Sequence, residues 1–171
     1  MRIALTGGIA CGKSLVSKYL NELGVETLDA DDIVHELIPD PAERKRIAAE
    51  VFGNEAKRRE LEARIHPLVR DRINRTIGQS DSRIIAIIPL LFEVHWEDNF
   101  DIICCVTSEK EAQVSRMMTT RGYTREEAEA RLAAQMPVAE KAVRSHYVIE
   151  NNGSEEELKS EVAKFVGWLK D

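Results

Sequence analysis

Short apolar runs alternate along the chain with longer segments in which apolar residues recur at helical spacing. The apolar runs predict five β-strands, at Arg2–Thr6, Val25–Leu28, Ile84–Ile88, Ile102–Val106 and Tyr147–Ile149. Strands that alternate with helical segments are typical of an α/β fold built on a parallel sheet. The chain has no internal repeat, low-complexity tract or Gly/Ser-rich linker, so we expect a single domain over residues 1–171.

Two of the helical segments have an apolar stripe along one face. The stripe of the first helix consists of Val16, Tyr19, Leu20 and Leu23. The stripe of the last helix consists of Leu158, Val162, Phe165, Val166 and Leu169. We expect both stripes to be buried, and Ser154 with Glu157 predicts a capping box at the start of the last helix.

Two long stretches between strands contain only helical signals. In the first, residues 40–78, Asp40 and Pro41 have the residue types expected for an N-cap and a first helical position. In the second, residues 109–144, Thr124 and Glu127 predict another capping box. Such insertions are typical of mobile pieces that close over a site, although helical packing layers would give the same sequence pattern.

Composition narrows the class of protein. The hydrophobic content is 43%, and the longest apolar run, from Ile84 to Phe92, covers half of the ~20 residues that span a bilayer. The apolar stretch after Arg2 is too short for a signal peptide. The three cysteines form no C-x-x-C spacing, which argues against a zinc site and favours a reducing compartment. We therefore expect a cytoplasmic protein without a membrane segment.

The net charge is −6 and the sequence pI is about 5.4, so the protein is acidic overall. An acidic balance argues against a nucleic-acid-binding surface. A small polyanionic substrate stays possible, because a pocket needs positive charge only locally.

The segment GGIACGKS, Gly7–Ser14, follows the first predicted strand and precedes a predicted helix. It matches G-x-x-x-x-G-K-[ST], the P-loop pattern, in the structural context that this motif requires. Glycines allow backbone amides to approach phosphate oxygens closely, and the following helix presents its positive end. Lys13 adds a charge toward the β- and γ-phosphates, and the Ser14 hydroxyl is suited to Mg²⁺. The segment predicts a nucleoside triphosphate site.

The rest of the chain favours a small-molecule kinase among P-loop proteins. The D-x-x-G and N-K-x-D motifs of GTPases are absent, and the strand Ile84–Ile88 ends in Pro89 rather than in the acid of motor ATPases. A kinase also needs an acid at the acceptor hydroxyl. Asp29, Asp31 and Asp32 follow the second predicted strand. Strand alternation would put the first two in register, and at least one of the three is expected to cap a helix that begins near Ile33.

Several motifs together resemble the dephospho-CoA kinase family. They are LTGGIACGKS, LDAD, ELEARIHPLV, IIPLLFE and RLAAQMPVAEKAVRSHYVIENNG, in this order over nearly the whole chain. The resemblance implies a three-layer P-loop kinase fold with a five-stranded parallel sheet. It also implies a helical CoA-binding region at residues 32–80 and a helical lid at residues 109–145.

The reaction that the resemblance implies transfers the γ-phosphoryl group of ATP to the ribose 3′-hydroxyl of dephospho-CoA. By position, the residues implied to bind ATP are Gly8, Ala10, Cys11, Gly12, Lys13, Ser14, Leu15 and Asn151, with Ser14 also at Mg²⁺. The implied catalytic residues are Lys13, Asp31 as base or orienting acid, and Arg116 of the lid helix. The implied substrate-binding residues are Asp31, His66 and Pro67, although His66 could instead cap or pack at a turn before Pro67.

The chain departs from the family pattern in four places. Leu15 replaces a hydroxyl residue, Thr120 stands where a second lid arginine is usual, with Arg121 next to it, and His146 replaces an aspartate. The stretch 37–40 is abrupt, because related chains carry an extra piece of the CoA-binding region there. Two other functions therefore stay open: a P-loop kinase for another small acceptor, and a nucleotide-binding regulatory protein without turnover.

Overall fold

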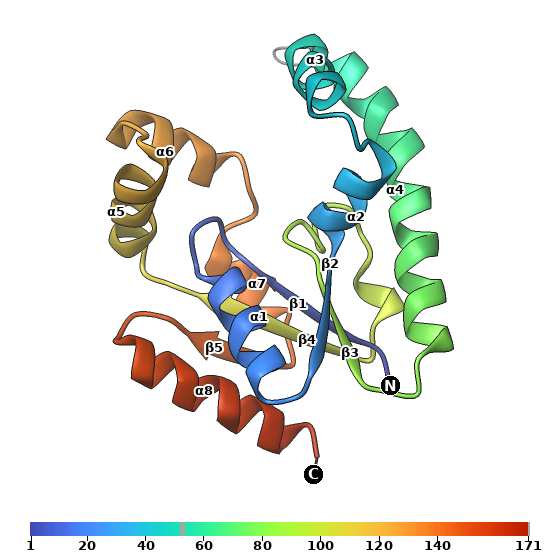
Figure 1. The fold of residues 1–171 in the computed structure, drawn as a ribbon. Helices are drawn as coiled ribbons and strands as arrows, with labels where there is room; N and C mark the ends of the chain where they lie inside the picture. The colour runs from blue at the N-terminus through green and yellow to red at the C-terminus, as the bar shows by residue number, and fades with distance from the viewer. Residues whose placement is uncertain (52–53, 171) are drawn as a thin grey trace. The chain divides into compact units, whose positions relative to one another are not determined.

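The computed structural model describes residues 1–51 and 54–170. Five strands form one sheet in the order β2-β3-β1-β4-β5 (Figure 1). Their bounds are β1 Ile3–Gly7, β2 Glu26–Asp29, β3 Ile84–Ile87, β4 Ile102–Thr107 and β5 Tyr147–Glu150. The pairs β1–β3, β1–β4 and β4–β5 all run parallel. The five predicted strands and the parallel α/β fold are confirmed.

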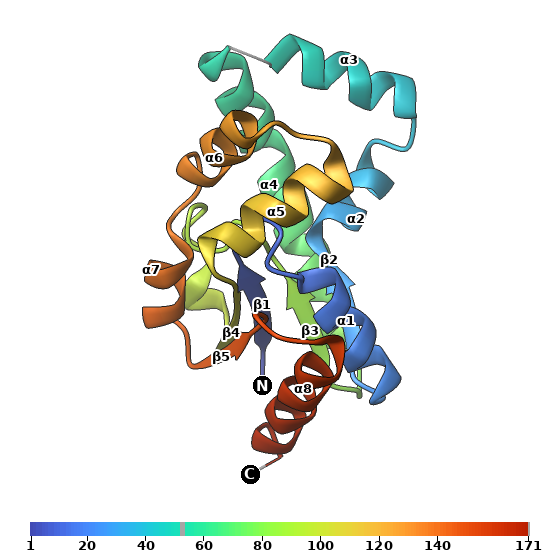
Figure 2. The same cartoon turned by 90° about the vertical axis from the view of Figure 1, so that its left-hand side faces the viewer.

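The residues of β1 and β3 are buried throughout, as expected for strands covered on both faces. The helices α1 (Lys13–Glu22) and α8 (Glu155–Trp168) pack against each other, and α7 (Val138–Val143) packs against β4 and β1. Figure 2 shows α7 on the opposite side of the sheet from α1 and α8. The sheet and these helices therefore form three layers, and a large hydrophobic core cluster is built from residues of the sheet, α1 and α8.

The predicted apolar stripes of α1 and α8 are buried with one exception. Leu23 is 48% exposed, because it lies just beyond α1 as its C-cap and no longer shares the helix face. The capping box of Ser154 and Glu157 at the start of α8 is confirmed. Each of these two side chains accepts a hydrogen bond from the backbone amide of the other, which satisfies two amides that the helix leaves without partners.

Two further helices, α5 (Lys110–Arg121) and α6 (Arg125–Ala133), form what we call the α5–α6 pair. Thr124 and Glu127 form the second predicted capping box, at the start of α6. The pair has a small apolar cluster of its own, made of Val114, Met117 and Ala128. These helices and the strands β1, β3, β4 and β5 belong to one compact unit, Met1–Thr27 with Ser82–Asp171.

The second compact unit is Leu28–Asp81 and is helical. It contains α2 (Ala30–Leu37), α3 (Pro41–Val51) and α4 (Glu55–Gln79). Asp40 accepts a hydrogen bond from the amide of Ala42 at 2.9 Å, so the predicted start of α3 is confirmed. Pro67 lies inside α4. The expectation that His66 caps or packs at a turn before Pro67 is therefore wrong. No helix within the described residues is long and apolar enough to cross a membrane.

Candidate functional site

The P-loop connects β1 to α1 through a backbone that only glycine fits at two positions. Gly7 has φ +147°, and a Cβ there would lie 2.3 Å from the carbonyl oxygen of Val106. Gly12 has φ +97°, and a Cβ there would lie 2.3 Å from the side-chain nitrogen of Asn151. Glycine is therefore needed at both positions for two reasons. It adopts a backbone conformation that other residues rarely adopt, and it lets the loop approach β4 and Asn151 closely.

The carbonyl groups of the P-loop are held by side chains. The Lys13 ammonium donates to the carbonyl oxygens of Gly7 at 3.0 Å and Gly8 at 2.8 Å. Three donors come from outside the loop. Gln113 donates to the carbonyl of Ile9 at 2.7 Å, Arg116 to that of Ala10 at 3.1 Å, and Asn151 to that of Cys11 at 2.8 Å. Every carbonyl from Gly7 to Cys11 thus has a side-chain donor.

The amides at the start of α1 have a different environment. Gly12 is the N-cap of α1, and its lack of a side chain leaves the helix without a side-chain cap. The first amides of a helix have no intrahelical carbonyl partner, and the helix dipole makes this end positive. An anion is the natural partner for such a helix end when the preceding loop has its carbonyls held elsewhere. The geometry therefore suits a phosphate group.

Ser14 lies in the first turn of α1 and is exposed, whereas Lys13 is half-buried. Among the described residues, no group of three His, Cys, Asp or Glu side chains could hold a metal ion. Mg²⁺ commonly uses one or two protein ligands together with substrate phosphates. A single exposed hydroxyl beside an anion site fits that mode of binding.

Arg116 and Asn151 form the support behind the loop. Besides the bond to Ala10, the Arg116 guanidinium donates to the Ser108 hydroxyl at 2.7 Å and to the carbonyl of Asn151 at 2.8 Å. The Ser108 hydroxyl in turn donates to the same carbonyl at 2.7 Å. Asn151 is 9% exposed. Arg116 therefore links α5, the end of β5 and the P-loop through three hydrogen bonds.

Cys11 is buried and belongs to the hydrophobic core cluster. Burial raises the pKa of the Cys11 thiol, although the positive charge of Lys13 opposes this effect. A thiol in this state is a weak nucleophile. A small buried side chain at this position is therefore explained by packing.

Gln113 and Gln135 both contact the P-loop, although neither was among the predicted site residues. The amide of Ile9 donates to the side-chain oxygen of Gln135 at 3.2 Å. Gln135 belongs to one of the motifs that carry the family resemblance, and this motif could have marked it as a site residue. Gln113 lies in a charged helical stretch with no such signal.

A buried lysine, Lys141, forms an ion pair with Glu93 in the segment that follows β3. The Lys141 ammonium is 0% exposed and lies 2.7 Å from a carboxylate oxygen of Glu93. It also donates to the carbonyl of Pro89 at 2.9 Å, and the same Glu93 oxygen accepts from the amide of Met136 at 3.1 Å. Glu93 therefore holds the segment between α6 and α7 through its hydrogen bond to the amide of Met136.

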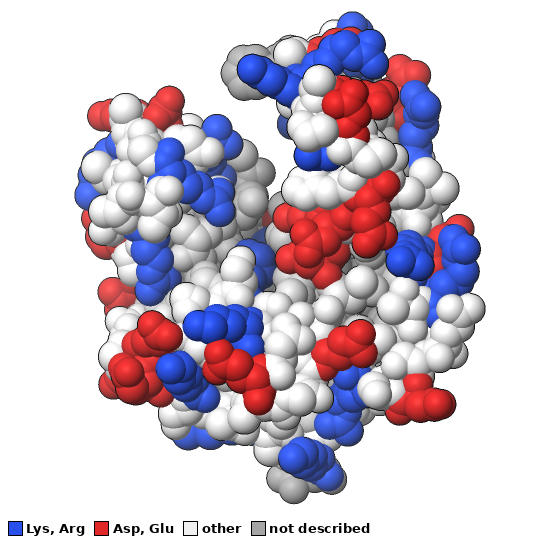
Figure 3. Space-filling view, in the orientation of Figure 1, with Lys and Arg blue, Asp and Glu red and all other residues white. Residues whose placement is uncertain are grey.

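In the second unit, Asp29 is the N-cap of α2 and accepts a hydrogen bond from the amide of Asp31 at 2.9 Å. The expected cap is therefore present, but α2 begins at Ala30 rather than near Ile33. Asp31 and Asp32 are both exposed in the first turn of α2. Because Asp31 lies in a helix, the expectation that strand alternation puts Asp29 and Asp31 in register is wrong. Figure 3 shows acidic side chains gathered over α2.

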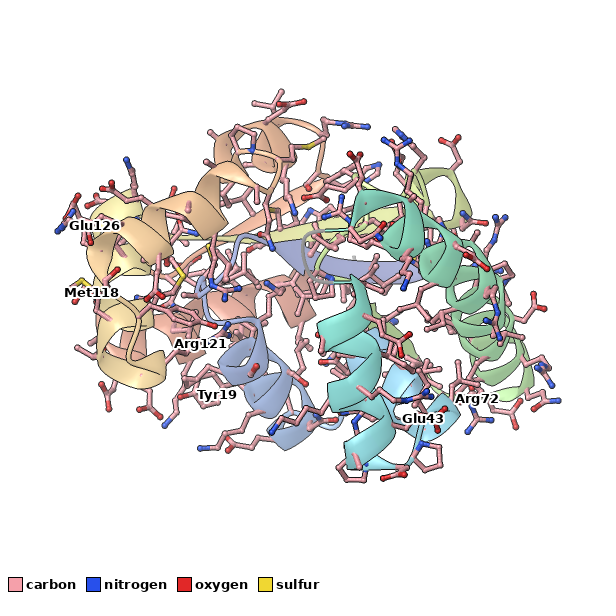
Figure 4. The ribbon with its side chains drawn as sticks, turned by 90° about the horizontal axis from the view of Figure 1, so that it is seen from above. Tyr19, Glu43, Arg72, Met118, Arg121 and Glu126 are labelled. Atoms are coloured by element: carbon pink, nitrogen blue, oxygen red, sulfur yellow. The ribbon has the colours of Figure 1, made fainter. Side chains whose placement is uncertain are left out.

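The other expected positions are placed as follows. His66 and Pro67 lie in the middle of α4, where His66 is half-buried and Pro67 exposed. Leu15 is exposed in α1. The Thr120 hydroxyl donates to the carbonyl of Arg116 within α5. Figure 4 shows Arg121 on the side of α5 that faces α1.

Comparisons with known proteins agree with this geometry. A family model described as dephospho-CoA kinase matches residues 1–43 and 41–157. The dephospho-CoA kinase of Geobacter sulfurreducens is 37% identical over 193 residues, covering 98% of this chain and 97% of that protein. The relative carries residues that this chain lacks, because the alignment is longer than the 171 residues here. The two parts of the family match meet beside the abrupt stretch 37–40.

Solved structures show the same fold. The crystal structure of TT1252 from Thermus thermophilus has a TM-score of 0.81 and 32% identity, covering 99% of this chain and 97% of that chain. The dephospho-CoA kinase from Campylobacter jejuni has a TM-score of 0.67 and 24% identity, covering 98% and 96%. The family match and the relatives at more than 30% identity show that the chain belongs to the dephospho-CoA kinase family of ATP-dependent P-loop kinases, and the geometry of the P-loop agrees with this.

Proposed function

We propose that this protein transfers the γ-phosphoryl group of ATP to the ribose 3′-hydroxyl of dephospho-CoA, giving CoA and ADP. The observation that carries the proposal is the P-loop whose carbonyls, from Gly7 to Cys11, are all bound by side chains. Such a loop offers amides rather than carbonyls to a triphosphate. The three cysteines of the protein are free and buried, which fits a reducing compartment such as the cytoplasm.

Phosphoryl transfer depends on in-line positioning and charge neutralisation more than on a strong base. Lys13 would exchange its bonds to the Gly7 and Gly8 carbonyls for bonds to phosphate oxygens. The Ser14 hydroxyl would hold Mg²⁺ together with the phosphates. When bound, Mg²⁺ supplies charge neutralisation at the β- and γ-oxygens.

Arg116 supports the ATP side of the site in this proposal. Its guanidinium binds the Ala10 carbonyl from behind the loop and fixes Ser108 and Asn151. The side chain of Asn151 lies next to Gly12. On the resemblance to the family, Asn151 is proposed to lie near the adenine of ATP. The role of Arg116 toward the transferring phosphoryl group is therefore one of electrostatic support and positioning.

Asp31 is proposed to orient or deprotonate the acceptor hydroxyl. Its support is an exposed carboxylate directly after β2, since ligands of open α/β sheets bind beyond the carboxyl ends of the strands. His66 and Pro67 are proposed to belong to the substrate-binding region, on the resemblance to the family.

The first test is ADP formation from ATP and Mg²⁺ with and without dephospho-CoA. Stimulation by dephospho-CoA supports the proposal. A second candidate function is that of a kinase for another small acceptor. It is supported by the residues that the relative carries and this chain lacks, because the two parts of the family match meet at positions 41–43, within the proposed substrate-binding region. Stimulation only by a different alcohol would select that candidate. Tight ATP binding without any turnover would select a regulatory protein.

The second test compares Asp31→Asn with Asp32→Asn, because both carboxylates are exposed in the same turn of α2. We expect Asp31→Asn to lower kcat by about two orders of magnitude or more with little change in ATP affinity, and Asp32→Asn to leave both nearly unchanged. An equal loss of ATP affinity in Asp31→Asn would move Asp31 to the metal instead. Equal effects of both substitutions would contradict a specific role for Asp31.

A further inference from the structure

Ile9, at the tip of the P-loop, is bound on both sides by glutamine side chains. Its carbonyl accepts from Gln113 at 2.7 Å, and its amide donates to Gln135 at 3.2 Å. Gln113 lies on α5 and is 3% exposed, while Gln135 lies between α6 and α7. A residue of α5 and a residue of the segment that follows α6 therefore bind the same residue of the P-loop.

The side chains of the loop tip point into the same helices. Ile9 and Ala10 pack against the apolar cluster of Val114, Met117 and Ala128 in the α5–α6 pair. A Cβ on Gly8 would lie 2.7 Å from the side-chain nitrogen of Gln113. The loop tip is thus in contact with these helices through both its backbone and its side chains.

The conformation of the loop tip is strained. Ala10 has φ +57°, in the left-handed region that residues with a side chain seldom occupy. Such a conformation persists only when the surrounding structure holds it. Gln113 binds the carbonyl before Ala10, and Arg116 binds the carbonyl of Ala10 itself. These two donors hold the peptide groups on either side of the strained residue.

The Gln135 side is anchored to the sheet. The next residue, Met136, donates its amide to Glu93, and Glu93 is paired with the buried Lys141. Lys141 also binds the carbonyl of Pro89, just after β3. Gln135 therefore holds the Ile9 amide from a fixed point, whereas Gln113 holds the Ile9 carbonyl from the α5–α6 pair.

We propose that Gln113 and Gln135 are positioning residues that hold Ile9 in its triphosphate-binding conformation and thereby couple the P-loop to the α5–α6 pair. The inference rests on the proposed ATP site but not on the identity of the acceptor. Without the Gln113 donor, the peptide between Ile9 and Ala10 could rotate, turning a carbonyl toward the phosphates and an amide away from them. Movement of α5 would then change ATP affinity, and ATP would restrain α5 and α6.

The test uses two substitutions that add the same charge but differ in hydrogen bonding. Gln113→Glu removes the donor to the Ile9 carbonyl, whereas Gln135→Glu keeps an acceptor for the Ile9 amide. We expect the Kd for ATP, measured by direct titration, to be at least about fivefold higher in Gln113→Glu than in Gln135→Glu. Equal Kd values in the two variants would overturn the proposal.

Gln113→Met and Gln135→Met provide neutral variants of similar size, in case a buried carboxylate prevents folding. Each should raise the Kd for ATP by about fivefold, because each removes one hydrogen bond to Ile9. Wild-type Kd values in both variants, with circular dichroism showing folded protein, would overturn the proposal. These titrations need no acceptor, so their failure differs from a failure of dephospho-CoA turnover.

Hydrogen exchange provides a readout that a merely structural glutamine would not change. In the wild type, ATP should slow amide exchange in α5 and α6. In Gln113→Met, at ATP concentrations that saturate the variant, this slowing should be lost in α6 while slowing at the start of α1 stays. Equal protection of α6 in the variant and the wild type would overturn the coupling.

Discussion

Asn151 donates its side-chain amide to the carbonyl of Cys11 at 2.8 Å, so the segment that follows β5 holds the P-loop from behind. The same side chain lies where a Cβ on Gly12 would be. The end of the last strand and the start of the first helix are therefore fixed relative to each other, although 140 positions separate Cys11 from Asn151.

Asn151→Asp should weaken ATP binding. The substitution removes the donor to the Cys11 carbonyl and puts a negative charge beside the phosphate site, and we expect the Kd for ATP to rise by about tenfold or more. Isothermal titration would measure it. Asn152→Asp is the matched control, because the Asn152 side chain accepts from the amide of Glu109 at 2.8 Å and a carboxylate can do the same. Equal losses in both variants would show that added charge alone is responsible.

Lys13→Ala should lower both ATP affinity and turnover. The ammonium is the one charged group that the P-loop motif directs to the β- and γ-phosphates, and its contribution extends to the transition state. Steady-state kinetics together with ATP titration would separate the two effects. Lys18→Ala, in the same helix but in an exposed pair with Glu22, should change neither. Unchanged ATP affinity in Lys13→Ala would contradict the proposed role.

Lys141→Met should destabilise the fold by about 3 kcal/mol, because it leaves the Glu93 carboxylate poorly solvated and without its counter-charge. One oxygen of Glu93 already has no hydrogen-bond partner within the described residues. Urea unfolding would measure the loss. The double variant Glu93→Gln with Lys141→Met should be more stable than Lys141→Met alone. A double variant as unstable as the sum of the single variants would argue against direct pairing.

The resemblance to the family leads us to expect aspartate at the position of His146, and the structure gives a physical reason why both residues are suitable. The amide of Ile103 donates to Nδ1 of His146 at 3.0 Å, so the side chain acts as an acceptor beside β4. His146→Asp and His146→Asn keep an acceptor and should retain wild-type stability. His146→Leu should cost about 1 kcal/mol, measured by urea unfolding. Equal stability of the leucine and asparagine variants would show that this bond contributes nothing.

The bond between Tyr19 and Glu155 should make stability depend on pH at both ends of the range. Its hydrogen bond lowers the pKa of Glu155, while burial and then this bond raise the pKa of Tyr19 from 10 to about 12. Stabilisation should be present above the ordinary carboxyl pKa and lost as the pH falls through the lowered value. It should also be lost as the pH rises from 10 through about 12.

The measurement for this pair is the free energy of unfolding of the wild type and Tyr19→Phe between pH 3 and pH 9. The difference between them should be largest near neutral pH and shrink in acid. A difference that stays constant across this range would show that the bond does not perturb the Glu155 carboxyl.

Much of the architecture was readable from local patterns. The five strands, the apolar stripes of α1 and α8, both capping boxes and the P-loop depend on residues close together in sequence, and such signals are local by nature. The errors arose where local alternatives compete. Leu23 continued the periodicity but lies past the helix end, and Asp31 followed a strand but lies in a helix.

The sequence by itself determined that a strand, a glycine loop and a helix N-terminus follow one another, because the glycines, Lys13 and Ser14 are neighbours. Only the tertiary structure decided what holds that loop. Gln113, Arg116 and Asn151 come from the distant α5 and the end of β5, and they converge because parallel strands β1, β4 and β5 end at one edge of the sheet. Backbone carbonyls need donors wherever the chain brings them, and no periodicity in the sequence specifies which side chain will be there.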